Sequence, residues 1–153
     1  MKDDQLEKFL EQSTPEFYSF AFVLIPDDLQ AGQLVIDSLA AFLISKKYLL
    51  ENDGYISQHM DIKIEIIHLI YDLAKKRFHQ VHLSLDELNN VGFYTLDFEQ
   101  RAALYLKDKA KYDNNSIALI LNKTGHEVTS FLYSARVKLV ENLPVTLHFE
   151  GKI

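Results

Sequence analysis

The polar residues best placed for chemistry follow a helix-start signal at Thr124. Its hydroxyl can accept a hydrogen bond from the backbone N–H of Glu127, and the Glu127 carboxylate can reach back to the N–H of Thr124. From there apolar residues recur at helical spacing, which leaves a polar face. The candidates on that face are His126, Thr129, Ser130, Tyr133, Arg136 and Lys138. Such side chains hydrogen-bond to base edges and phosphates, so the pattern predicts a DNA-reading helix.

The alternative interpretation of the same helix is a plain solvated face. The capping pattern accounts for Glu127 without DNA, and Arg136 and Lys138 can equally bind carbonyl groups at a helix end. No Lys or Arg occurs between Gly125 and Ala135. Because few counterions would be released from DNA by such a face, its affinity would be modest. The sequence leaves both interpretations open.

This helix, expected over 124–140, is the last of three that begin at residue 97. The helix before it, over 114–122, is joined to it by a turn too short for a domain linker, which is typical of a helix-turn-helix unit. Further lysines precede the last helix and are additional candidates for phosphate contacts. They are Lys107, Lys109, Lys111 and Lys123.

The first 80 residues predict a separate helical unit. A short first helix should end before Pro15, because Thr14 can cap a new helix that has Pro15 at its first position. That second helix covers 16–25, a longer one covers 29–50, and another of about 20 residues over 57–77 begins at a capping Ser and ends on basic residues.

Two segments lie outside these helices. Residues 81–96 are rich in Ser, Asp, Asn and Gly and predict a linker between a unit at 1–80 and a unit at 97–142. The tail at 143–153 alternates apolar and polar residues like a strand, although no partner strand is visible. We therefore predict an all-α protein of two small helical units, the second a three-helix helix-turn-helix domain.

Charge is distributed unevenly along a chain whose net charge is −6. Residues 1–96 hold 8 Lys and Arg against 15 Asp and Glu, a net −7; residues 97–139 hold 7 against 5, a net +2; and residues 140–153 hold 1 against 2, a net −1. The segment 97–139 is thus the basic part of the chain, where a nucleic-acid interface is expected.

The composition argues against an enzyme. The chain has no cysteine, which excludes disulfides, thiolate metal sites and cysteine nucleophiles and suits a reducing cytoplasm. His79 and His82 have metal-compatible spacing, but no second histidine pair follows. Neither a phosphate-binding loop nor a hydrolase or metalloprotease motif occurs. We expect no catalytic residue, metal or cofactor, and neither a secretory signal nor a membrane span is visible.

Several short motifs resemble the extracytoplasmic-function sigma factors. Those similar to the family's DNA-reading domain are Gln100-Arg101, Ser116 to Leu121, Val128-Thr129-Ser130 and Ala135 to Leu139. The segment from Pro26 to Leu39 resembles the family's polymerase-docking helix, which implies docking roles for Gln33, Ile36 and Asp37. The chain departs from the family at Ser116 (glutamate in the family), Glu127 (threonine), Thr129 (lysine), Phe131 (arginine) and Ser134 (arginine).

The resemblance and the residues together support two functions. The first is a divergent sigma-like transcription regulator in the cytoplasm that binds RNA polymerase core, promoter DNA or both through the helix-turn-helix. The alternative is a pseudo-sigma interaction module that no longer binds DNA and recognises a regulatory protein instead. The sequence specifies no oligomeric state.

Overall fold

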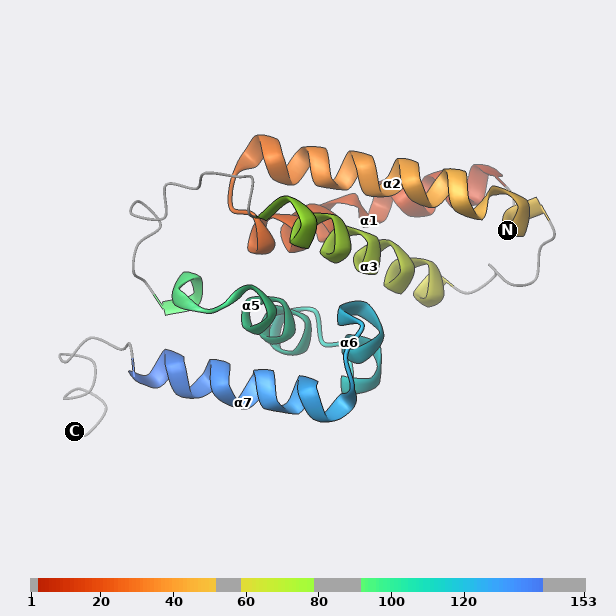
Figure 1. The fold of residues 1–153 in the computed structure, drawn as a ribbon. Coiled ribbons are helices and arrows are strands. Elements are labelled where there is room, and N and C mark those ends of the chain that lie inside the picture. The colour runs from red at the N-terminus through yellow and green to blue at the C-terminus, as the bar shows by residue number, and fades with distance from the viewer. Residues whose placement is uncertain (1–2, 52–58, 79–91, 142–153) are drawn as a thin grey trace. The chain divides into compact units, whose positions relative to one another are not determined.

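The computed structural model describes residues 3–51, 59–78 and 92–141 (Figure 1). Every regular element among them is helical, so the predicted all-α class is confirmed. The chain divides into two compact units, the first built from 1–83 with 119–122 and the second from 84–118 with 123–153. No described helix combines the length and the apolar character needed to cross a membrane.

Some sequence predictions lie outside the described residues. These are the capping Ser57, the pair His79 and His82, most of the linker and the strand-like tail at 143–153. The described end of the predicted linker contains a short 3-10 helix, η1, over Gly92–Thr95.

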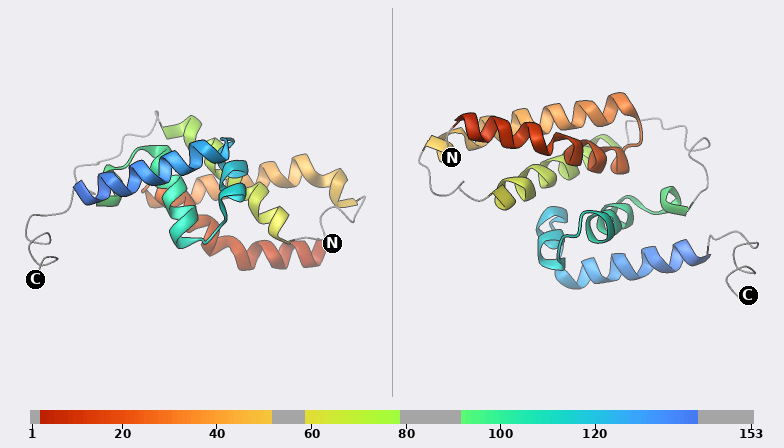
Figure 2. Two further views of the ribbon diagram at one scale, coloured as in Figure 1. Left: turned by 90° about the horizontal axis from the view of Figure 1, so that it is seen from below. Right: turned by 180° about the vertical axis from the view of Figure 1, so that it is seen from behind.

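The first unit is a bundle of three helices, each packed against the other two. They are α1 (Asp3–Leu24), α2 (Asp28–Glu51) and α3 (His59–Phe78). Successive helices run in opposite directions (Figures 1 and 2). Aromatic and branched side chains from all three helices fill the core. The largest that are fully buried are Phe17, Phe20, Leu24, Leu34, Phe42, Ile66, Ile67 and Ile70.

The predicted helix break at Pro15 is wrong. Helix α1 runs through it from Asp3 to Leu24, with Pro15 inside. The buried positions explain why, because their three-to-four-residue spacing continues across the proline. They are Leu6, Phe9, Leu10, Ser13, Phe17, Phe20, Ala21 and Leu24. An internal proline costs about 3 kcal/mol, whereas each large apolar side chain buried contributes about 1.5–3 kcal/mol. Packing therefore outweighs the local preference.

We expect Pro15→Ala to stabilise the protein by about 1–3 kcal/mol. Pro15 is exposed, so alanine restores a backbone donor without disturbing the core, and part of the gain is offset by the greater freedom of the unfolded chain. Urea denaturation measures the change, with Ser19→Ala as a nearby exposed control. A lower midpoint for Pro15→Ala would show that the proline is not strained in this helix.

The second unit holds the candidate DNA contacts and most of the helices from residue 98 onward, apart from residues 119–122 at the end of α6. Helix α5 (Phe98–Leu104) continues into a π-helical turn, η2 (Tyr105–Lys109), and is followed by α6 (Asn114–Leu121) and α7 (Gly125–Glu141). Helices α5 and α7 pack against each other. The α7 residues buried in this unit are Val128, Leu132 and Ala135.

Two adjoining caps make the turn between α6 and α7. Asn122 has a left-handed φ of 54°. Its N–H donates to the carbonyl of Leu119, and the N–H of Lys123 donates to the carbonyl of Ala118. These two hydrogen bonds form a Schellman motif, which ends α6. Thr124 then starts α7, because its hydroxyl accepts from the Glu127 N–H at 3.1 Å and its own N–H donates to Glu127 Oε1 at 3.1 Å. The predicted capping box and the tightly joined helices are confirmed.

We expect Thr124→Ala to destabilise the protein by about 1 kcal/mol, because the first turn of α7 loses its cap. Thr129→Ala, a threonine exposed on the same helix, should change stability little. Hydrogen bonds from Thr124 lower the pKa of Glu127, so the stabilisation from this carboxylate is present above the ordinary glutamate pKa and is lost as pH falls through the lowered pKa. Thermal melts should therefore show wild type and Glu127→Gln converging in acid, and parallel curves would exclude the box.

Candidate functional site

The exposed face of α7 is the one that the sequence predicts. His126, Thr129, Ser130 and Tyr133 are all exposed, Tyr133 to 73%. The Thr129 hydroxyl donates to the Gly125 carbonyl at 3.1 Å, which occupies its proton within the helix. The face therefore offers hydrogen-bonding groups but no positive charge along its first three turns.

The two cations farther along α7 each lie beside a carboxylate of the same unit. Arg136 Nη2 is 3.0 Å from Asp108 Oδ1, and Lys138 Nζ is 3.5 Å from Asp97 Oδ1. Such partly exposed pairs contribute only about 0–1 kcal/mol to stability. They nevertheless reduce the net charge of the surface, so they reduce the counterion release that binding DNA could provide. The partners of Arg136 and Lys138 are thus these carboxylates, where the sequence suggested helix-end carbonyls.

The lysines before α7 are also mixed with polar and acidic groups. Lys107 donates to the Asn114 side chain at 2.9 Å, while Asp113 accepts from the Ser116 N–H at 2.8 Å and caps α6. Lys109 and Lys111 are exposed. The attraction of Lys123 helps to lower the pKa of Glu127, after the larger effect of the hydrogen bonds from Thr124.

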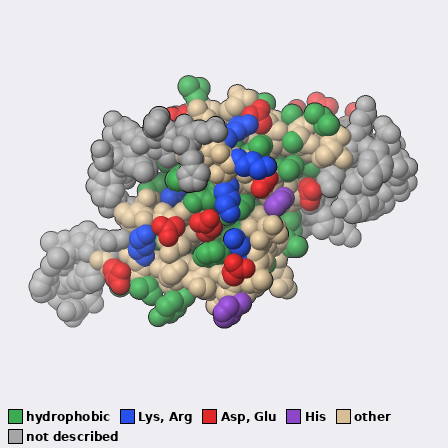
Figure 3. Space-filling view, in the orientation of Figure 1, with side chains coloured by type: hydrophobic (Ala, Val, Ile, Leu, Met, Phe, Trp, Pro, Cys, Tyr) green, Lys and Arg blue, Asp and Glu red, His purple; other side chains and the backbone are tan. Residues whose placement is uncertain are grey.

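Charges of both signs are interspersed on the surface. In Figure 3, the Lys and Arg side chains alternate with Asp and Glu on the face in view, and no large area of one sign forms there. DNA-binding surfaces usually gather positive charge along the path of the phosphates. The nucleic-acid interface that the segment's net charge suggests stays a prediction of the sequence.

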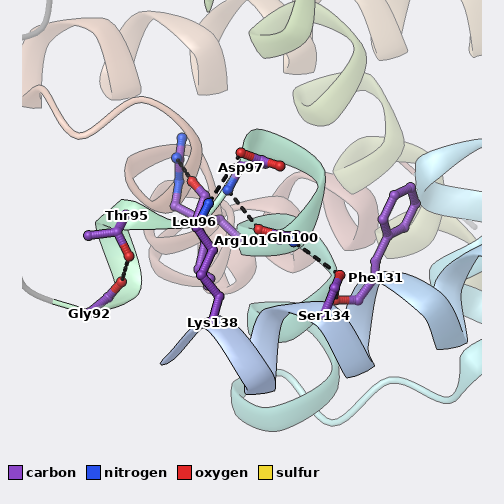
Figure 4. Close-up of polar contacts among 9 residues, drawn as sticks. All are labelled: Gly92, Thr95, Leu96, Asp97, Gln100, Arg101, Phe131, Ser134 and Lys138. Carbon is purple, nitrogen blue, oxygen red and sulfur yellow. Dashed lines mark hydrogen bonds and ion pairs between the residues drawn. The ribbon is translucent and has the colours of Figure 1, made fainter. Parts of the chain in front are cut away.

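Arg101, the strongest basic match to the sigma-factor motif, is buried. It is 4% exposed, and its Nη1 donates to the Leu96 carbonyl at 2.8 Å (Figure 4). Its Cζ lies 6.0 Å from the centroid of the Tyr94 ring. Burial lowers the pKa of the guanidinium, opposed by Tyr94, Asp97 and Glu99. This cation therefore anchors the start of α5 and is not presented to a ligand.

The neighbouring Gln100 links α5 to α7. Its Oε1 accepts from the Asp97 N–H at 3.0 Å, and its Nε2 donates to Ser134 Oγ at 3.0 Å (Figure 4). Ser134 and Phe131, where the family pattern has arginine, are both half-buried. These substitutions place an interhelical hydrogen bond and an apolar ring where the family pattern has two cations.

On α2, the polar docking candidates Gln33 and Asp37 form a hydrogen bond with each other, and Asp37 also pairs with a residue of α3. Gln33 Nε2 donates to Asp37 Oδ1 at 2.9 Å, and Arg77 Nη2 lies 2.6 Å from Asp37 Oδ2. The hydrogen bond from Arg77, followed by that from Gln33, lowers the pKa of Asp37. Ile36, between them in sequence, is 61% exposed. Gln33 is exposed as well, so the apolar candidate and one polar candidate are open to solvent.

Sequence reasoning missed the extent of exposed apolar surface. On α2, Leu29 is 85% exposed and Ile44 is 80% exposed, with Leu43 also exposed. On α7, Tyr133, Val137 and Val140 are exposed and line a shallow depression together with Arg136 and Glu141. The signal that could have revealed the first surface is that α2 carries apolar residues on more than one face. Within the described ranges, no group of three His, Asp or Glu side chains could hold a metal ion.

The arrangement of these helices defines a sigma-like fold. No protein-family model matches the sequence, and no curated protein matches it. Among the solved structures that are similar, two are complexes with an anti-sigma factor. The co-crystal structure of the sigma factor RpoE in complex with the anti-sigma factor NepR from Bartonella quintana matches with a TM-score of 0.68 and 19% identity, over 90% of this chain and 96% of that chain.

The second similar structure is that of the anti-anti-sigma factor PhyR complexed with the anti-sigma factor NepR, also from Bartonella quintana. It matches with a TM-score of 0.64 and 14% identity. The match covers 90% of this chain and 50% of that chain, so this chain spans about half the length of that neighbour. At these identities the likeness establishes the fold.

We expect Arg101→Met to destabilise the protein by about 1–3 kcal/mol, because the buried Leu96 carbonyl loses its donor. Lys138→Met, which removes a partly exposed pair, should cost about 0–1 kcal/mol. Urea denaturation compares the two variants. If Arg101→Met instead changed DNA retention without changing stability, the assignment of Arg101 as a structural anchor would be wrong.

Proposed function

We propose that this chain is a sigma-like regulatory protein that acts by binding another protein and does not read promoter DNA. The observation that carries the proposal is the placement of the cations in the second unit. Arg101 is buried, and Arg136 and Lys138 each lie within 3.5 Å of a carboxylate. The scaffold therefore keeps the form of a promoter-binding protein with little net positive charge to hold phosphate.

The partner class follows from the similar structures and from the exposed surface. Both neighbours are complexes with an anti-sigma factor, so we propose a regulatory protein of the anti-sigma type as the partner. Apolar surface is available on α2 around Ile36 and on α7 around Tyr133. Contiguous exposed apolar surface of this kind marks protein–protein contacts more often than nucleic-acid contacts. In this proposal, the docking unit is 1–80 and the protein acts in the cytoplasm without a cofactor.

A second candidate function, promoter binding with polymerase core, has one observation in its favour. Lys109 and Lys111 are exposed, as are the hydrogen-bonding groups of Thr129 and Ser130. Each phosphate that a lysine neutralises contributes about one unit to the salt slope of DNA affinity. Two lysines would give a shallow slope and weak retention, so this candidate makes a measurable prediction of its own.

We expect a gel-shift assay at low salt to show no retention of a promoter duplex by the wild-type chain. The double variant Asp97→Asn with Asp108→Asn releases Lys138 and Arg136 from their carboxylates, so it should show weak, salt-sensitive retention. Glu7→Gln with Glu11→Gln makes the same change in net charge on exposed positions of α1 and should show none. Wild-type retention with a slope of about two or more would overturn the proposal.

Calorimetry with purified NepR, and co-sedimentation with RNA polymerase core, test the choice of partner. Binding of NepR without binding of polymerase supports the proposal. Binding of polymerase core together with retention of promoter DNA would establish the second candidate function instead.

A further inference from the structure

We draw no further inference here: the strongest candidate, the exposed apolar face of α7 where Tyr133, Val137 and Val140 line a shallow depression, is an unpartnered surface, and nothing in the structure shows what covers it.

Discussion

Packing of α5 against α7 decides what the second unit presents to solvent. Val128, Leu132 and Ala135 are buried in this unit, and Gln100 of α5 donates to Ser134 of α7. Once these residues are inside, helical geometry places Thr129, Ser130 and Tyr133 outside. The same packing buries Arg101 at the start of α5. The second unit thus leaves a polar face of α7 exposed and buries a cation of α5.

The first unit is also held together by buried apolar side chains, but it leaves other apolar side chains of α2 exposed. A continuous apolar spacing along α1 keeps the helix intact through Pro15, because the buried aromatic side chains on either side stabilise it by more than the proline costs. On α2, however, the apolar residues exceed what the bundle can cover. Leu29, Ile36 and Ile44 remain exposed to solvent. This unit therefore has a buried core and, in addition, apolar side chains on its surface.

Three aspartates in the two units are paired with basic side chains. Asp37 is paired with Arg77, Asp97 with Lys138, and Asp108 with Arg136. Each pair is weak as a source of stability because it is partly exposed. Together they set a carboxylate beside each of Arg77, Arg136 and Lys138. The exposed apolar side chains of α2 and α7 lie outside these ion pairs.

Much of the fold could be predicted from periodicity and caps, which are local properties. The helical class, the turn between α6 and α7 and the capping box at Thr124 depend on residues within a few positions of each other. The exposure of His126, Thr129, Ser130 and Tyr133 follows from the same spacing. The break expected at Pro15 was wrong because the apolar spacing continues across the proline, and the packing of those side chains outweighs the proline's local preference.

The amino-acid sequence by itself determined which residues form helices, where α7 begins and which of its faces is polar, because these depend on backbone preferences and on the helical repeat. Tertiary structure decided which charges remain available. Asp108 lies 28 positions from Arg136, and Asp37 lies 40 positions from Arg77. Pairings over such distances arise only when helices pack, and so does the burial of Arg101. The sequence therefore supplied the helices, and packing determined that Arg101 is buried and that Arg136 and Lys138 lie beside carboxylates.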